Sequence, residues 1–136
     1  MSNTGPHLES LIHSLKTGTP RAAYVARQEL IGLGPVAEAP LRHLLTEVKD
    51  PHRILDVLAI LQEVKLSNPA SVDSVVKLLS HKETLVRRAA AHCLLVSSPK
   101  LRRVLARIRV AHDAERDEGV LATLGKLLDR YPSGAA

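Results

Sequence analysis

The residue types that most often carry out chemistry are present in this 136-residue chain, but their spacing does not match a catalytic or metal-binding motif. No two of the seven histidines have the i, i+4 spacing that places a pair of imidazoles on one helix face. Gly32-Leu33-Gly34 lacks the preceding strand and the following Lys-Ser or Lys-Thr pair of a phosphate-binding loop. We therefore expect no catalytic residue, no metal and no cofactor, and we interpret the histidines as surface residues.

The single cysteine, Cys93, excludes a disulfide within the chain. It falls on an apolar helical stripe with Ala89 and Ala90, a position that predicts a buried, unreactive thiol rather than a nucleophile. A lone thiol fits a reducing compartment. The first six residues do not resemble a signal peptide, and no apolar run approaches the roughly 20 residues that span a bilayer. These features predict a soluble cytoplasmic protein.

Charge is the sharpest local signal in the chain, whose formal net charge is +5. No acidic residue lies between Glu83 and Asp113. That interval holds the basic residues Arg87, Arg88, Lys100, Arg102, Arg103, Arg107 and Arg109. A guanidinium group can donate two parallel hydrogen bonds to a carboxylate or a phosphate, so these are candidate partner-binding residues. The alternative is a solvated face without a partner. For a functional patch, an acidic protein and a nucleic acid both stay open.

The elements that must position these side chains are helices. Apolar residues recur at helical spacing along nearly the whole chain, and no stretch alternates as a half-buried strand would. The chain has no Phe and no Trp, so the core must consist of Leu, Val, Ile and Ala. The apolar stripes predict helices that cover residues 8–15, 23–33, 41–48, 54–64, 72–79, 86–96, 101–108 and 120–128.

Every second helix follows a repeat. Ala23, Ile54, Val86 and Asp117 align with one another at offsets of 31, 32 and 31 residues, and the apolar positions that follow them align too. Two helices per unit at this period indicate an α-solenoid, in which hairpins stack because none can bury its apolar face alone. The first and last helices carry one apolar stripe each, as terminal caps do. We expect one domain over residues 6–131, with flexible tails at 1–5 and 132–136.

The second helices resemble the HEAT-repeat superfamily, in particular its short bacterial members related to bilin-lyase repeats. The residues that carry the resemblance are Val86-Arg87 and Ala89-Ala90 within the segment 83–94, Leu33-Gly34, Leu124-Gly125, and Asp50-Pro51 at a turn. The resemblance implies an all-α superhelix of about four helical hairpins, roughly eight helices in all. It also implies a binding scaffold, without naming a partner.

HEAT-like solenoids often bind partners on the inner face of their second helices. Outside the core stripe, that face would carry Tyr24, Gln28, Asp56, Glu63, Arg88, His92, Thr123 and Lys126. Mixed charge suits a protein more than a polyanion, and Tyr24 is either an anchor or a residue packed at the edge. We therefore expect a non-catalytic protein–protein interaction scaffold or adaptor, by default a monomer. The alternative is a nucleic-acid-binding HEAT-like module that uses the arginines of residues 87–109 and binds in a salt-sensitive way.

Overall fold

The computed structural model describes residues 4–97 and 100–132, which are almost entirely helical and contain no strand, so the predicted all-α class is confirmed. The α-helices are α1 (Thr4–Thr17), α2 (Pro20–Leu33), α3 (Glu38–Glu47), α4 (Pro51–Val64), α5 (Pro69–Lys77), α6 (Thr84–Ser97), α7 (Leu105–Ala114) and α8 (Glu118–Asp129). Short 3-10 turns are η1 (Gly34–Ala37), η2 (Leu78–Ser80) and η3 (Arg102–Val104). Because α1 begins at Thr4, the expected N-terminal tail is shorter than predicted; residues 1–3 and 133–136 of the expected tails lie outside the described residues.

Polar caps fix where several helices begin. The side chains of Thr19, Asp50 and Asn68 accept hydrogen bonds from backbone N–H groups in the first turns of α2, α4 and α5, each of which starts with proline. Asp117 caps α8 in the same way through the N–H of Val120. This cap explains why the last repeat has an acid where the other second helices have an apolar residue: α8 starts only after that position.

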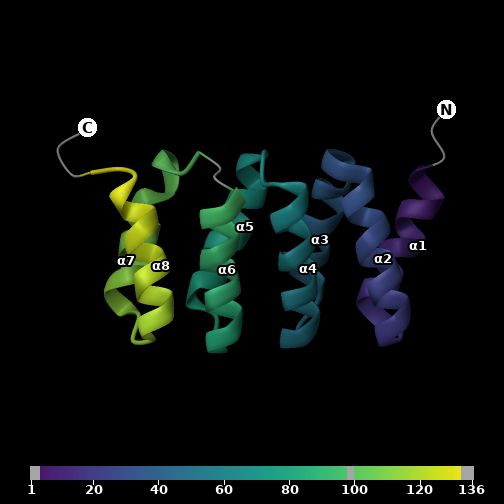
Figure 1. Ribbon diagram of the computed structural model, residues 1–136, viewed down its shortest axis with the longest axis horizontal. Coiled ribbons are helices and arrows are strands. Elements are labelled where there is room, and N and C mark those ends of the chain that lie inside the picture. Colours follow the sequence, from purple (N-terminus) through teal and green to yellow (C-terminus); the bar gives the residue numbers. More distant parts are fainter. Residues whose placement is uncertain (1–3, 98–99, 133–136) are drawn as a thin grey trace.

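The hairpins follow one another through space in chain order, with α2, α4, α6 and α8 side by side in one layer (Figure 1). Each of these helices packs on the next, and each hairpin also closes on its own first helix. On the other side, α1 contacts α3 and α3 contacts α5. Neighbours in sequence are thus neighbours in space. That this array is a HEAT-type solenoid stays a prediction.

The core between the layers is aliphatic. Every helix contributes buried residues to one continuous cluster, and the largest fully buried side chains are leucine and isoleucine. The predicted stripe of α6 is wrong at its end, because Val96 is exposed whereas Ala91 and Leu94 are buried. The physical reason is that α6 packs against both α4 and α8, so its buried arc is wider than one stripe and ends before the last turn. None of the described helices is long and apolar enough to cross a membrane.

The layer of first helices is interrupted at its last step. In the described part of the chain, the backbones of α5 and α7 come close at few points at most, although the side chains of Arg107 and Asp73 join the two helices; α7 packs on α8 and touches η2. The connection into α7 contains the 3-10 turn η3, which replaces the first turn of an α-helix there. This interruption separates the third and fourth hairpins on that side of the molecule and shapes the surfaces described below.

The ends of α2 and α4 offer a test of the repeat. Gly34 caps α2 with φ of 71°, and Lys65, 31 residues later, caps α4 with φ of 84°. A side chain in this region costs about 1 kcal/mol that glycine avoids. We expect Lys65→Gly to raise the free energy of unfolding by about 1 kcal/mol in urea denaturation. Lys65→Ala, the control, should leave it close to wild type; a less stable glycine variant would contradict a strained cap.

Candidate functional site

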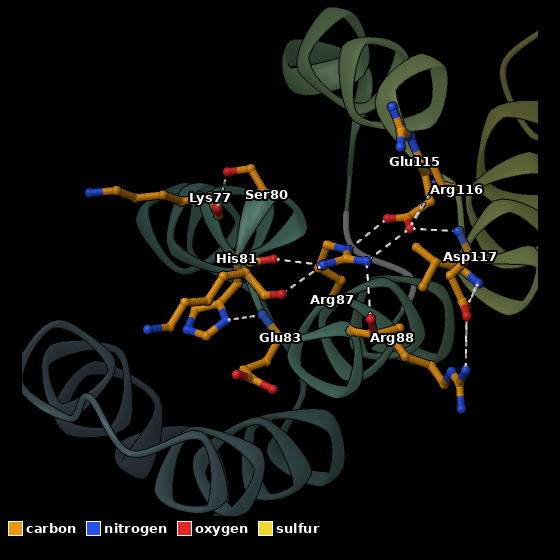
Figure 2. A network of polar contacts seen from close by, with 12 residues as sticks. Lys77, Ser80, His81, Glu83, Arg87, Arg88, Glu115, Arg116 and Asp117 are labelled. Atoms are coloured by element: carbon orange, nitrogen blue, oxygen red, sulfur yellow. Dashed lines mark hydrogen bonds and ion pairs between the residues drawn. The ribbon is translucent and has the colours of Figure 1, made fainter.

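Arg87 lies at the junction between the third and fourth hairpins and is fully occupied by the protein itself (Figure 2). Its Nε and Nη2 donate to the two carboxylate oxygens of Glu115 at 2.9 and 3.2 Å. Nη1 donates to the backbone carbonyls of His81 and Lys82, and Nη2 also donates to Thr84 Oγ1. A guanidinium group has only five N–H donors, and these contacts use them all. This candidate binding residue therefore has no donor left for a partner.

Glu115, at the start of the loop between α7 and α8, is the other half of this junction. Its side chain is 2% exposed, and it also accepts hydrogen bonds from the backbone N–H groups of Arg116 and Asp117. Burial alone raises the pKa of the Glu115 carboxyl, but the hydrogen bonds and charge of Arg87 and the two backbone N–H groups outweigh burial and lower the pKa. Glu115 is therefore ionised at neutral pH and belongs to the structure of the junction.

Arg88 is the exposed neighbour of Arg87 and turns toward the N-terminus of α8 (Figure 2). Its Nη2 lies 3.3 Å from both carboxylate oxygens of Asp117, the residue that caps α8. The hydrogen bond from the N–H of Val120 is the main cause that lowers the pKa of Asp117, and Arg88 adds to it. The sequence assigned Arg88 both to the basic patch and to the inner face; in the structure it belongs to a surface ion pair.

Arg103 and Arg107 come together on one carboxylate. Nη2 of Arg103 and Nη1 of Arg107 lie 3.0 and 3.2 Å from Oδ1 of Asp73 on α5, and the same Arg103 nitrogen donates to the carbonyl of Pro69. Both side chains are exposed. Two positive charges thus share one negative charge, which leaves an excess of positive charge at this point of the surface.

The remaining basic residues of the patch spread around the fourth hairpin. The guanidinium of Arg102 lies over the ring of Tyr131, 5.4 Å from its centre, a distance at which a cation and an aromatic face attract each other. Tyr131 in turn accepts a hydrogen bond from the N–H of Leu101. Lys100 and Arg109 are exposed. The seven basic residues therefore form no single free patch: some join the hairpins, and others face the surroundings.

The residues predicted for the inner face lie on consecutive helices of the layer formed by α2, α4, α6 and α8 (Figure 1). Tyr24 is 63% exposed, so its ring is available as an anchor and is not packed away. Gln28, Glu63 and His92 are exposed, and Asp56 is half-buried. This face is a surface of mixed charge rather than a pocket.

The predicted burial of Cys93 is confirmed, since its side chain is inaccessible in α6. Burial raises the pKa of the thiol to about 11, against smaller opposite effects of Ser97 and Lys65. The thiol is therefore protonated at neutral pH, and a protonated thiol is a poor nucleophile. Among the described residues, no three His, Cys, Asp or Glu side chains lie close enough together to hold a metal ion.

The sequence reasoning missed a groove of about 740 Å³ between the third and fourth hairpins. Its lining includes Val76 and Leu79 on one side and Ala106, Val110 and Ala114 of α7 on the other. The signal that could have revealed it is a second row of small apolar residues on α7, at i, i+4 and i+8, beside the row that enters the core. That row faces the interruption between α5 and α7.

We expect the replacement of two adjacent arginines, Arg87 and Arg88, to lower the free energy of unfolding by very different amounts. Arg87→Ala should lower the free energy of unfolding by about 3 kcal/mol, because it leaves the buried Glu115 carboxylate without its partner. Arg88→Ala, the matched control, breaks only an exposed pair and should cost less than about 1 kcal/mol. Urea denaturation followed by circular dichroism measures both, and equal losses would contradict a special role for Arg87.

The lowered pKa of Glu115 predicts how stability depends on pH. A group whose pKa is lowered on folding stabilises the protein above its unfolded pKa, ordinarily 4.5, and loses that effect as the pH falls through its folded pKa. Glu115→Gln should therefore cost about 2 kcal/mol at neutral pH and progressively less below about pH 4.5. Denaturation at several pH values measures the difference from wild type, and a difference that does not change with pH would refute this expectation.

Comparison with protein-family models, with curated proteins and with solved structures found no match to this chain. The candidate surfaces therefore rest on the chain's own geometry. They are the Arg103–Arg107 pair on Asp73, the face of α2, α4, α6 and α8, and the groove beside α7.

Proposed function

We propose that this chain is a non-catalytic scaffold of the HEAT-repeat type that binds an acidic protein partner in the cytoplasm. The observation that carries the proposal is the Arg103–Arg107 pair, in which two guanidinium groups are held at one carboxylate, Asp73. Stacked hairpins provide an extended surface suited to such contacts. A reducing compartment agrees with the buried, unpaired Cys93.

The Arg103–Arg107 pair is suited to capture a further carboxylate. The contacts with Asp73 and Pro69 use one nitrogen of each guanidinium, and the other nitrogens have no hydrogen-bond partner within the described residues. Asp73 holds both side chains in place, so less rotamer freedom is lost when a partner binds. A carboxylate from a partner would also balance the excess positive charge.

A second surface supports a protein partner over a polyanion. The face of α2, α4, α6 and α8 presents Tyr24 near the start of the array, Asp56 and Glu63 on α4, and on α6 Arg88, which is paired with Asp117, and His92. Tyrosine is enriched among residues that dominate binding energy at protein interfaces. Alternating charge repels a uniform polyanion but fits a protein whose charges alternate in the opposite sense.

A nucleic-acid-binding function is the second candidate, and the exposed basic residues of the fourth hairpin favour it. Lys100, Arg102 and Arg109 have no carboxylate partner in the part of the chain that the structure describes. Phosphate contacts through such residues would be independent of nucleotide sequence, and their affinity would fall steeply with salt.

The test of the scaffold proposal is affinity capture from the source organism with wild type and two charge variants. One variant combines Arg102→Gln, Arg103→Gln and Arg107→Gln; the control combines Lys16→Gln, Arg21→Gln and Lys49→Gln, which removes equal charge from the first two hairpins. We expect the first variant to lose specific partners by about tenfold while the control retains them. Equal recovery with both variants would contradict binding through the Arg103–Arg107 pair.

The same proteins separate the two functions when titrated with labelled DNA and RNA at about 50 mM and about 200 mM salt. The scaffold proposal predicts no binding that survives the higher salt. Tight binding at both salt levels that is lost in the Arg102, Arg103 and Arg107 variant would favour the nucleic-acid function instead. Circular dichroism must show unchanged helix content in each variant.

A further inference from the structure

We infer that the groove between the third and fourth hairpins binds an acidic amphipathic helix of a partner protein. The inference rests on the proposed scaffold function and names its site and the kind of segment that it takes. It depends on three features of the groove: an exposed apolar row on α7, a place beside the layer of first helices, and a lining with more basic than acidic side chains.

The exposed apolar surface of the groove lies on α7. Val76 and Leu79 form the base and are already buried, and the small residues of α7 form one wall. Val110 is 69% exposed, the largest exposed fraction among the big apolar side chains of the chain's described part. Ala106, Val110 and Ala114 are all exposed, so nothing in the described chain covers this row. Covering such surface releases about 25 cal/mol for each Å² of apolar area removed from water.

The position of the groove in the array favours a helix as the occupant. The groove lies where the layer of first helices is interrupted, so an added helix would extend the packing that already joins α1 to α3 and α3 to α5. Helices pack with their axes about 8–10 Å apart, and alanines at the contact permit the closer end of that range. Ala106 and Ala114 stand on either side of Val110 along α7. Apolar side chains at i, i+3, i+4 and i+7 of the partner would reach this row.

The charges around the groove select an acidic helix. Its lining contains five lysine or arginine side chains and a single carboxylate, that of Glu115. Arg87 already occupies this carboxylate, so the remaining cations, such as Lys82 and Arg116, have no acid in the lining to balance them. His81 is the other titratable group of the lining, and its Nδ1 accepts a hydrogen bond from the N–H of Glu83. Glutamate or aspartate on the flanks of the bound helix would meet these cations.

An apolar floor distinguishes this site from a phosphate-binding surface. Nucleic acid carries phosphates on its outside and flat bases that stack on aromatic rings, and the residues that line the groove include no Phe, Tyr or Trp. An acidic amphipathic helix carries both an apolar stripe and carboxylates. The stripe would contact the apolar residues of the groove, and the carboxylates would pair with its basic residues.

The experiment uses a fluorescein-labelled peptide of about 14 residues, long enough to span α7, with leucines at i, i+3, i+4 and i+7 and glutamates on the flanks. Fluorescence anisotropy with the full chain measures its dissociation constant. Two further peptides test the recognition: a scrambled sequence of the same composition, and a version with glutamine in place of glutamate. We expect the original peptide to bind at least about tenfold more tightly than either.

Two pairs of variants locate the site. Val110→Glu puts a charge on the α7 wall of the groove, and Val36→Glu puts the same charge on a valine that is 50% exposed and lies in η1, away from the groove. Arg116→Glu reverses a charge of the lining, and Arg109→Glu makes the same reversal on an exposed arginine of α7 outside the lining. We expect Val110→Glu and Arg116→Glu to weaken peptide binding by about tenfold or more, and each control by less than about twofold.

Several results would overturn the inference. They are no binding of the original peptide, equal binding of the scrambled peptide, or equal effects of a groove variant and its control. The outcome is separable from that of the scaffold proposal. If the Arg102, Arg103 and Arg107 variant loses its cellular partners while the peptide fails to bind, the scaffold function stands and the groove is not its site. A labelled oligonucleotide that competes with the peptide, and whose binding Val110→Glu abolishes, would show that the groove takes nucleic acid instead.

Discussion

The ion pair between Arg87 and Glu115 is the buried polar contact that connects the fourth hairpin to the rest of the array, beside the aliphatic packing of α6 on α8. The Glu115 carboxylate belongs to the loop that joins α7 to α8. The side chain of Arg87 extends from α6 and also donates hydrogen bonds to backbone carbonyls of the loop before α6. Because Glu115 is almost completely buried, the pair is strong only while every donor and acceptor is used, and every donor of Arg87 is used. This pair therefore joins the fourth hairpin to the third, together with the contacts of Arg88 with Asp117 and of Arg103 and Arg107 with Asp73.

Other polar contacts repeat this arrangement along the chain. Glu38 on α3 is buried and accepts hydrogen bonds from the backbone and hydroxyl of Ser67 and from the backbone N–H of Asn68, one hairpin later. Burial raises the pKa of Glu38, but these hydrogen bonds outweigh that effect and lower it. Arg53 on α4 donates to the carbonyls of Leu15 and Gly18 at the end of α1. An aliphatic core allows neighbouring helices to slide at small cost, and directional polar contacts define one register.

The same contacts determine which surface stays available for binding. Acidic residues from neighbouring hairpins neutralise Arg87 and Arg88, whereas Arg103 and Arg107 must share Asp73. Positive charge therefore accumulates beside α7 and not beside α6. The interruption between α5 and α7 lies at the same place and leaves apolar residues of α7 uncovered. The scaffold proposal and the groove inference both follow from this coincidence of charge and apolar surface.

The sequence by itself determined the helices and most of the core. Apolar spacing predicted that each helix exists, and the burial of Cys93 and of the stripe from Leu101 to Ile108 followed from helical periodicity. The bounds of the seventh helix were wrong, because the segment expected at 101–108 contains the 3-10 turn η3 and α7 runs from Leu105 to Ala114. These properties are local, because a helix places residues three and four apart on the same face regardless of the rest of the fold. The error at Val96 arose where a second neighbouring helix widened the buried arc.

Only the tertiary structure decided which arginines are free. The interval without acidic residues suggested one continuous basic patch, yet the acids that pair with it come from residues 28 to 34 positions away in the chain. The groove could not be predicted for the same reason, since it lies where the backbones of α5 and α7 come close at few points at most. Such partners are set by how one hairpin stacks on the next, and local spacing contains no information about that step.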